Sequence, residues 1–434
     1  MTTLIDLSPR PVAQSPLADL PVIVIGAGPV GLAAAAHLAD RGIAFVVLEA
    51  GGDVAAQVRR WGHTTLFSPW RYLVDPVAER LLSATGWITP ADDVVPTGHE
   101  LVDRYLAPLA QLSGIAERIR FGTEVVSVSR RGMDRTRTAG RAQAPFVVRV
   151  CDTDGAVTEL TGRAVIDASG TYASPNPLAS SGLDPLGVDA AADRIVHALP
   201  DVRGADADAF AGRHTVVVGA GHSAANTLIA LAELADERPG TRVSWVIRNA
   251  SAVRVSSSPD DELPDRARLG ARVDALVARG AVHLVDSFEI AAVEPAGSGV
   301  RLLGTRRDEP FSLDADVVVN ATGFRPDLAM LREIRLELDA VVEAPRRLAP
   351  LIDPNDHSCG TVAPHGFREL SHPEPGFFIV GMKSYGRAPT FLLATGYEQV
   401  RSVTAWLDGD VDAAQQVRLQ LPATGVCSSD GCCA

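Results

Sequence analysis

A glycine-rich turn between two apolar segments constrains the fold of this chain more than any other stretch. Residues 22–25 are apolar and short enough for a buried parallel strand, and residues 44–48 have the same character. Between them, Gly26, Gly28 and Gly31 form a G-x-G-x-x-G pattern at the start of an alanine-rich helical segment. This order of strand, turn, helix and strand is typical of a dinucleotide-binding unit, in which the glycines permit a tight turn, backbone approach to a pyrophosphate and close helix packing.

The residues around this turn suit a ligand that carries phosphate. Pro29 and Val30 begin the helical segment, and the free N–H groups and dipole of a helix N-terminus favour negative charge. Glu49 ends the second apolar segment, where an acidic side chain can hold ribose hydroxyls. The alternative is a glycine-rich turn in an ordinary α/β unit. We predict a first dinucleotide site at Gly26, Gly28, Pro29, Val30, Gly31 and Glu49.

A second unit of the same kind begins at His214. Residues 215–218 predict a strand, residues 225–235 a helix and residues 243–247 a second strand. The second strand leads to Arg248, which can pair with a 2′-phosphate where an acid would repel it, so NADPH is favoured over NADH. The alternative is a solvated surface arginine. The turn residues of this second predicted site are Gly219, Gly221, His222, Ser223 and Ala224.

Apolar patterns outside these units predict further elements. We expect a helix at 98–112, with its leucines on one face, and another near 389–406. Strands are expected at 121–128, 145–150, 163–169, from 317 onward and at 373–381. An arginine-rich stretch at 130–141 is expected to form a variable loop.

Together, the two glycine turns and the Ala321-Thr322-Gly323 turn resemble two-dinucleotide-fold flavoproteins, particularly the flavin-containing monooxygenases. The resemblance covers roughly residues 20–407. It implies that the first fold binds FAD and that an inserted second fold binds NADPH. The crossings between the two domains match Ala321-Thr322-Gly323 and its imperfect copy Ala168-Ser169-Gly170. We therefore expect further cofactor contacts from Val125, Ala168, Gly170, Thr322, Gly323 and Lys383.

The expected fold class is α/β, with two Rossmann-like dinucleotide-binding domains and the NADPH domain inserted in the FAD domain. Pro175 and Pro177 mark a boundary because they interrupt the strand pattern. The expected divisions are a flexible lead-in at 1–18, a discontinuous FAD-binding domain at 19–178 and 324–410, an NADPH-binding domain at 205–323 and a cysteine-containing tail at 411–434.

A narrower resemblance points to flavin monooxygenases of bacterial arsenic-resistance clusters. It rests on short segments at 67–70, 356–360, 364–366 and 381–391, and on the cysteine-bearing tail. It implies that reduced flavin reacts with O2 to a peroxyflavin, which oxidises a soft nucleophile, with a trivalent arsenical or antimonite as the expected substrate. N- or S-oxygenation of a small metabolite stays open, as do a flavoprotein reductase and a thiol protein that sequesters metalloid.

Lys383 is the only lysine among the forty lysines and arginines of the chain. A chain with this bias replaces lysine wherever arginine serves, so a compact ammonium group is expected to be needed at this position. A cation there could stabilise reduced, anionic flavin, since a helix N-terminus in this region commonly faces the flavin. The alternative is that this lysine remains by chance and has no special role.

Trp70 and four of the five cysteines are the other candidates for the reaction. Trp70 ends an irregular segment, 57–70, that could wall a cofactor or substrate, or could belong to the core. Cys359 could present a metalloid to the flavin or be an ordinary loop residue, and its spacing to neighbouring histidines is not a zinc pattern. Cys427, Cys432 and Cys433 in the tail could capture a soft metalloid.

Composition excludes several classes of function. The net charge of −13 and pI near 5.2 argue against nucleic acid or an anionic membrane as partner. No signal peptide is evident, so we expect a cytoplasmic protein that uses O2 and a small-molecule or metalloid substrate, with an oligomeric state that the sequence does not indicate. Residues 1–150 and 152–358 contain no cysteine, which argues against a disulfide reductase with a flavin-proximal dithiol.

Overall fold

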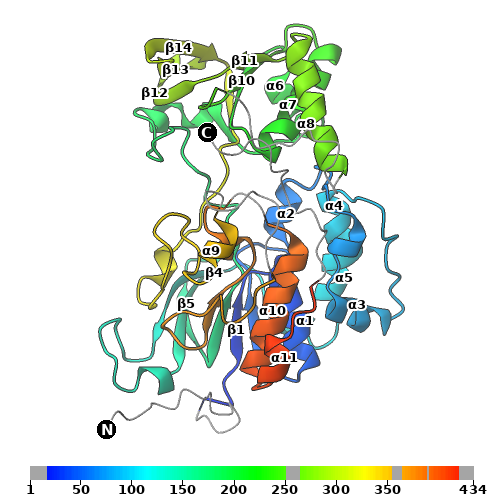
Figure 1. Ribbon diagram of the computed structural model, residues 1–434, viewed down its shortest axis with the longest axis vertical. Coiled ribbons are helices and arrows are strands. Elements are labelled where there is room, and N and C mark those ends of the chain that lie inside the picture. The colour runs from blue at the N-terminus through cyan, green and yellow to red at the C-terminus, as the bar shows by residue number, and fades with distance from the viewer. Residues whose placement is uncertain (1–16, 251–263, 354–363, 389–390, 420–434) are drawn as a thin grey trace.

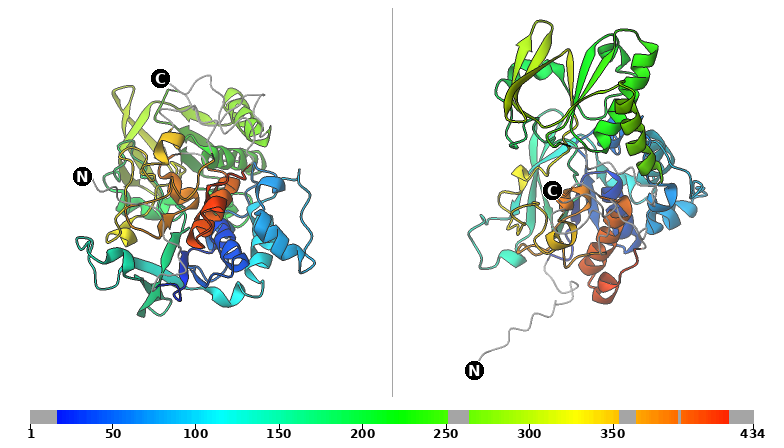
Figure 2. Two further views of the ribbon diagram at one scale, coloured as in Figure 1. Left: turned by 60° about the horizontal axis from the view of Figure 1, so that its bottom comes forward. Right: turned by 45° about the horizontal axis from the view of Figure 1, so that its top comes forward.

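The computed structural model describes residues 17–250, 264–353, 364–388 and 391–419. Two parallel sheets, each covered by helices, lie in the upper and lower parts of Figure 1. The right-hand view of Figure 2 shows the same separation, with the middle of the chain in one part and both ends of the described chain in the other. No helix within these described ranges is long and apolar enough to cross a membrane.

The first sheet, in the lower part, has five parallel strands in the order β16-β7-β1-β2-β3. Its strands are β1 (Val22–Ile25), β2 (Phe45–Leu48), β3 (Ile119–Arg120), β7 (Ala164–Asp167) and β16 (Phe377–Ile379). Residues Ile25, Leu48 and Asp167 stand side by side in register, so the carboxyl ends of the central strands form one edge. Strands β1, β2 and β7 are apolar runs because parallel strands are covered on both faces.

The second sheet repeats this arrangement in the order β11-β10-β9-β15-β8, also all parallel. Its strands are β8 (Ile195–His197), β9 (His214–Val218), β10 (Arg242–Val246), β11 (His283–Val285) and β15 (Val317–Asn320). Val218, Val246 and Asn320 end the three central strands at one edge. The strand order reverses beside β1 in the first sheet and beside β9 in the second, which is where ligands of such folds bind.

Two small antiparallel sheets accompany the parallel ones, one in each part of Figure 1. The first contains β4 (Thr123–Arg130), β5 (Phe146–Asp152) and β6 (Val157–Gly162), and the second contains β12 (Phe288–Ala296), β13 (Gly299–Arg306) and β14 (Glu309–Ala315). The pattern predicted β4 and β5, whereas the second sheet was not predicted. A bulge between Ile290 and Ala292 shifts the alternation of β12, and β13 places Leu302 and Leu303 side by side, so the period-two signal of the sequence is poor.

Helices cover the sheets and connect their strands. The α-helices are α1 (Pro29–Asp40), α2 (Ala56–Arg60), α3 (Pro76–Ser83), α4 (Gly98–Leu101), α5 (Ala107–Ala110), α6 (Ala207–Phe210), α7 (His222–Glu237), α8 (Pro264–Ala278), α9 (Ala349–Ile352), α10 (Leu393–Leu407) and α11 (Val411–Gln415). Shorter 3-10 helices are η2 (Trp70–Tyr72), η4 (Ala116–Arg118), η5 (Arg141–Gln143), η6 (Val188–Arg194), η7 (Ala329–Leu331) and η8 (Gly381–Tyr385).

The helix predicted at 98–112 is present but contains one π-turn, η3 (Val102–Leu106), between α4 and α5. Pro108 has no N–H group to donate to the carbonyl of Arg104, and the indole Nε1 of Trp87 donates to that oxygen instead, at 2.8 Å. A side-chain hydrogen bond thereby replaces the missing backbone bond, and the helix continues through one wider turn.

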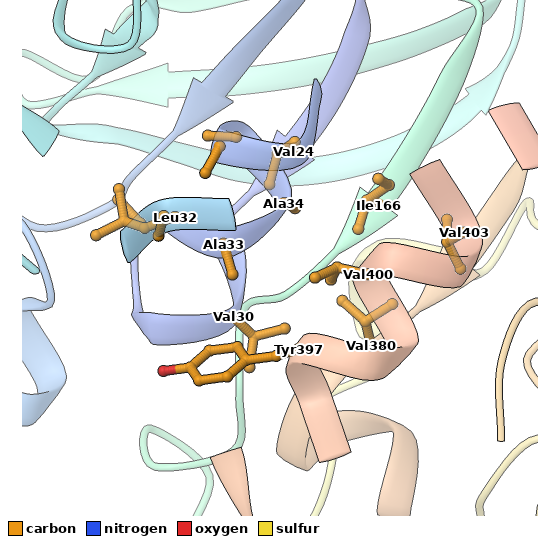
Figure 3. Packing of buried hydrophobic residues seen from close by; sticks show 14 of the residues in the cluster. Val24, Val30, Leu32, Ala33, Ala34, Ile166, Val380, Tyr397, Val400 and Val403 are labelled. Atoms are coloured by element: carbon orange, nitrogen blue, oxygen red, sulfur yellow. The ribbon is translucent and has the colours of Figure 1, made fainter. Parts of the chain in front are cut away.

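The main core lies between β1, α1 and α10 (Figure 3). Four consecutive alanines, 33–36, are fully buried on α1, and their small side chains let α10 approach closely. Val400 and Val403 of α10 and Val380 after β16 fill the remaining space. Each buried valine contributes about 1.5–3 kcal/mol relative to exposure. This packing fixes the N-terminus of α1 against the end of β16.

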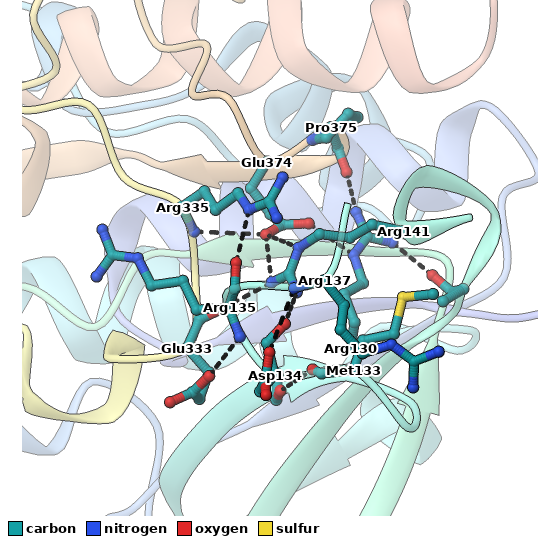
Figure 4. A network of polar contacts seen from close by, with 12 residues as sticks. Arg130, Met133, Asp134, Arg135, Arg137, Arg141, Glu333, Arg335, Glu374 and Pro375 are labelled. Atoms are coloured by element: carbon teal, nitrogen blue, oxygen red, sulfur yellow. Dashed lines mark hydrogen bonds and ion pairs between the residues drawn. The ribbon is translucent and has the colours of Figure 1, made fainter. Parts of the chain in front are cut away.

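The arginine-rich loop at 130–141 is fastened by a buried carboxylate rather than free (Figure 4). Glu374 accepts hydrogen bonds from Arg130 Nε at 2.8 Å and from Arg141 Nη2 at 2.7 Å, and all three side chains are buried. The Arg130 guanidinium also stacks on Phe146. Two cations around one carboxylate hold the loop onto the segment before β16.

Two crossing segments join the upper and lower parts and are bonded to each other. Pro175 and Phe324 form an antiparallel bridge, and the N–H of Asn176 donates to Gly323 O at 2.9 Å. The Asn320 amide donates to Asn176 O at 2.9 Å, and the Thr322 hydroxyl oxygen lies at the same distance from that carbonyl oxygen. The crossings therefore form one short two-stranded connection. We keep the boundaries 19–178, 205–323 and 324–410 as a proposed division of the chain.

Candidate cofactor and active site

The first glycine turn is shaped by three different steric demands. Gly26 has φ +98°, and a Cβ there would lie 2.8 Å from the carbonyl oxygen of Ala168. A Cβ on Gly31 would lie only 1.9 Å from Gly26 O, so α1 could not pack at this distance with any other residue. Gly28 has an ordinary φ of −79° and open space where its Cβ would be. That open space is what backbone approach to a pyrophosphate requires.

The N-terminus of α1 faces the same space without a side-chain cap. Pro29 and Val30 form its first turn, and Gly28 is the residue before it. The N–H of Ala27 donates to Glu49 Oε2 at 2.7 Å, while Glu49 Oε1 accepts from the N–H of Gly51 at 2.8 Å. These bonds orient the carboxylate at the end of β2, and its remaining lone pairs suit ribose hydroxyls.

The second glycine turn repeats this geometry in the second sheet. Gly219 has φ +131°, and its Cβ would lie 2.1 Å from Ala321 O, as that of Gly26 would lie near Ala168 O. Gly221 again has open space at the N-terminus of α7, whose first turn has no side-chain cap. Ala224 is buried at the third position of the motif. Two uncapped helix N-termini beside open glycines fit two dinucleotides.

Other residues predicted for the second site lie around this turn. His222 and Ser223 form the first turn of α7 and are half-buried, and Arg248 is exposed just beyond β10. Thr322 and Gly323 follow β15 at the crossing, and the Thr322 hydroxyl also bonds Asn320 Oδ1 at 2.7 Å. In the first domain, Ala168 and Gly170 occupy the equivalent crossing after β7. Val125 is half-buried at a bulge of β4.

Lys383 does not stand alone as the predicted flavin-facing cation. Its Nζ lies 2.8 Å from Asp167 Oδ2, and both side chains are buried. The Nζ also donates to Ser169 Oγ at 3.0 Å. An adjacent carboxylate offsets the positive charge, so Lys383 presents a compensated ion pair rather than a net charge. Sequence reasoning missed Asp167, although an acid at the end of an apolar strand is a visible signal.

A buried hydrogen-bond network holds the residues that flank Lys383 in η8. Gln399 on α10 accepts from the N–H of Gly381 at 2.7 Å and donates to Ser384 Oγ at 2.9 Å. Its amide also lies 2.9 Å from His365 Nε2, which acts as the acceptor when the amide nitrogen donates. Burial raises the pKa of the neighbouring Tyr385, so its phenol stays neutral. The network holds η8 against α10.

The remaining predicted residues divide into buried and undescribed ones. Trp70 is fully buried in the first core cluster, with the Arg104 guanidinium over its ring, which matches the alternative of a core tryptophan. Its role in the reaction stays a prediction. Cys359, Cys427, Cys432 and Cys433 lie outside the described residues. Cys151, on β5, is a free cysteine of the described part.

A cavity of about 530 Å³ lies between the two parts of the molecule. Residues 63–67 line it from the first part, and residues 199–203 with one face of α7 line it from the second. The ring of Phe67 lies 5.1 Å from that of His222, so the cavity begins close to the second glycine turn. The segment 57–70, which could wall a cofactor or substrate or belong to the core, borders this cavity through its middle residues.

The charged residues of the cavity gather around Glu233. Arg203 donates to Glu233 at 2.6 Å and to Glu237 at 2.7 Å, and Arg272 donates to Glu233 at 2.7 Å. Apolar side chains such as Phe67 and Ile229 occupy other parts of the lining. No group of three or more His, Cys, Asp or Glu side chains in the described ranges could hold a metal ion.

Comparison with known proteins agrees with this geometry. The pyridine nucleotide-disulphide oxidoreductase family matches residues 23–361, which is most of the chain. The chain belongs to this family. It is an NADPH-dependent flavoprotein oxidoreductase with FAD and NADP(H) as cofactors. That its two glycine turns hold these two nucleotides stays a prediction.

Individual relatives are distant. The chain is 27% identical to the indole-3-pyruvate monooxygenase YUCCA6 of Arabidopsis thaliana over 232 residues, which is 52% of this chain and about half, 48%, of that protein. It is 26% identical to YUCCA1 of Oryza sativa subsp. japonica over 89% of this chain and 78% of that protein. A bacillithiol disulfide reductase of Bacillus cereus superposes with a TM-score of 0.66 at 20% identity, covering 90% of this chain and 99% of that one, which establishes the fold alone.

Proposed function

We propose that this flavoprotein is a monooxygenase that transfers one oxygen atom from O2 to a soft nucleophile. The observation that carries the proposal is the presence of two glycine turns, each at an uncapped helix N-terminus, in a sequence that has no cysteine in 1–150 or 152–358. A disulfide reductase of this fold needs two cysteines beside the flavin, and neither the first turn nor the second domain can supply them. The matched curated relatives described above are monooxygenases by name.

The reaction consumes NADPH, H⁺, O2 and a lone-pair donor, and yields NADP⁺, water and the oxygenated donor. Bound FAD supplies hydride acceptance from NADPH and the reaction of reduced flavin with O2. The chain's own contribution is to hold both nucleotides through Gly28, Gly221 and the two uncapped helices, to orient Glu49, and to exclude water through the packing around α10.

The first candidate substrate is a trivalent arsenical or antimonite. Its support comes from the resemblance of segments such as 67–70 and 381–391 and from the tail cysteines, whose soft thiolates suit a metalloid. In this scheme Cys427, Cys432 and Cys433 capture the metalloid and Cys359 presents it to the flavin.

The cavity favours a second candidate, a small organic amine or thioether. Cavities of about 300–1,000 Å³ hold small organic ligands, and 530 Å³ is far more than a single arsenite needs. Phe67 and Ile229 provide apolar surface, which a small inorganic hydroxide such as As(OH)3 does not require. A methylated trivalent arsenical lies between the two candidates in size and polarity.

The test measures NADPH oxidation and O2 consumption by the FAD-loaded enzyme, with arsenite, a methylated trivalent arsenical and a panel of amines and thioethers. We expect a true substrate to raise both rates together and to carry one atom of ¹⁸O from ¹⁸O2 into the product. NADPH oxidation that continues without O2 when an artificial electron acceptor is present, with no labelled product from any substrate, would identify a reductase instead.

The arsenical candidate has its own matched variants. Cys359→Ala should abolish stimulation of NADPH oxidation by arsenite, whereas Cys151→Ala, which removes the half-buried thiol of β5, should leave it unchanged. Unchanged stimulation in Cys359→Ala would rule out the presenting role of Cys359 and leave the monooxygenase proposal to the oxygen-labelling result.

A further inference from the structure

The Asp167–Lys383 pair combines two buried charges with an exposed neighbour. Asp167 is the last residue of β7 and Lys383 lies in η8, and their side chains are 0% and 1% exposed. Ser169 Oγ donates to Asp167 Oδ1 at 2.7 Å and accepts from Lys383 Nζ, while Ser169 itself is exposed. The pair therefore lies one side chain beneath the surface.

That surface belongs to the first nucleotide site. Asp167 stands beside Ile25 in the sheet, and Ile25 directly precedes Gly26. On the other side, the Cβ position of Gly381, the first residue of η8, lies 3.2 Å from Val30 in the first turn of α1. Both partners of the pair are thus held by elements that form the FAD site.

Stability alone does not explain the pair. Removing two charges from water costs several kcal/mol per ion, and an apolar pair of the same shape is often as stable. An arginine would have been the default cation in this chain, but its planar guanidinium is larger than an ammonium group and does not act as a point charge. The chain therefore keeps its single lysine where a compact cation faces a carboxylate.

We propose that Asp167 is a positioning residue that fixes the Lys383 ammonium beside the FAD site and offsets its charge. FAD gains negative charge when it is reduced, so an uncompensated cation nearby would favour the reduced form. With Asp167 in place, the pair has no net charge, and only its dipole acts on the flavin. This inference rests on FAD in the first site and holds for an oxygenase or a reductase alike.

The test compares midpoint potentials of bound FAD in the purified holoenzyme. Asp167→Asn leaves the ammonium hydrogen-bonded but uncompensated, so the potential should shift to more positive values than wild type. Lys383→Met leaves the carboxylate uncompensated, so the potential should shift to more negative values. The double variant D167N/K383M, with no charge, should return toward wild type.

A purely structural pair would give a different pattern. In that case the variants would lower the melting temperature and weaken FAD binding, with no shifts of opposite sign in potential. Glu374→Gln serves as the matched control, because it breaks a buried ion pair outside the FAD site and should destabilise without changing the potential. If one single variant does not fold, an unshifted potential in the other is enough to overturn the proposal.

Discussion

His372 is a buried imidazole whose protonation opposes folding. Burial lowers its pKa to about 4, and its Nδ1 accepts a hydrogen bond from the N–H of Glu337 at 3.2 Å, which requires the neutral ring. Because the folded-state pKa is below the unfolded value near 6.5, the contribution to stability is complete above pH 6.5 and is lost as the pH falls toward 4. Between pH 7 and pH 5 the loss is about 2 kcal/mol.

Urea unfolding of wild type and His372→Gln at these two pH values tests the predicted loss of stability. The glutamine retains an acceptor for the Glu337 N–H but does not titrate, so its stability should change less with pH. His283→Gln replaces an exposed histidine and should behave like wild type. Equal pH dependence in His372→Gln and wild type would show that His372 is not the group responsible.

The residues that the sequence predicted best are those whose role is local. Gly26 and Gly31 follow from the backbone demands of one turn, and the structure shows those demands directly. Lys383 was predicted as a lone cation because its partner, Asp167, is 216 positions away and meets it only through the sheet. The charge balance of a buried side chain depends on such long-range neighbours, which one-dimensional patterns do not contain.

At the scale of one element, two glycines at the start of α1 allow packing and ligand binding to be tested separately. Gly31→Ala places a Cβ against Gly26 O, so it should lower the melting temperature of the apoprotein and also FAD affinity. Gly28→Ala meets no protein atom and has an allowed φ, so it should leave the apoprotein melting temperature unchanged while weakening FAD binding.

Thermal unfolding of the apoprotein and FAD titration measure the two effects separately. Gly221→Ala makes the matched change at the N-terminus of α7 and should weaken NADPH binding with FAD binding intact. Wild-type FAD affinity in Gly28→Ala would mean that the pyrophosphate does not approach this backbone.

Elements with strong apolar periodicity were predicted closely. The strands at β1, β2, β9 and β10 differ from their expected bounds by one residue at most. The meander of β12, β13 and β14 was missed because its residues are mixed in polarity and its pairing is set by two tight turns. The π-turn was missed because it depends on Trp87, a residue outside the helix.

At the scale of the whole molecule, two crossing segments join the upper and lower parts. Asn320 lies at the centre of their contact. Its Nδ2 donates to Asn176 O at 2.9 Å, and its Oδ1 accepts from the hydroxyl and the N–H of Thr322, at 2.7 and 3.2 Å. Tyr172, His197 and Phe324 stack beside it, with ring centroids 4.6–5.5 Å apart. The relative position of the domains should therefore depend on a few polar bonds.

Asn320→Ala removes these three side-chain bonds without touching either glycine turn. Losing about 1–2 kcal/mol of local bonding raises the open population of the crossings roughly tenfold, so chymotrypsin should cut after Tyr172 and Phe324 about tenfold faster. Thr241→Val, which removes bonds to Gly212 and Arg238 within the second domain, should not change those two cleavages. Fragment mass spectrometry assigns the cut sites. Equal cleavage rates in Asn320→Ala and wild type would mean that the aromatic stack, rather than the hydrogen bonds, holds the crossings together.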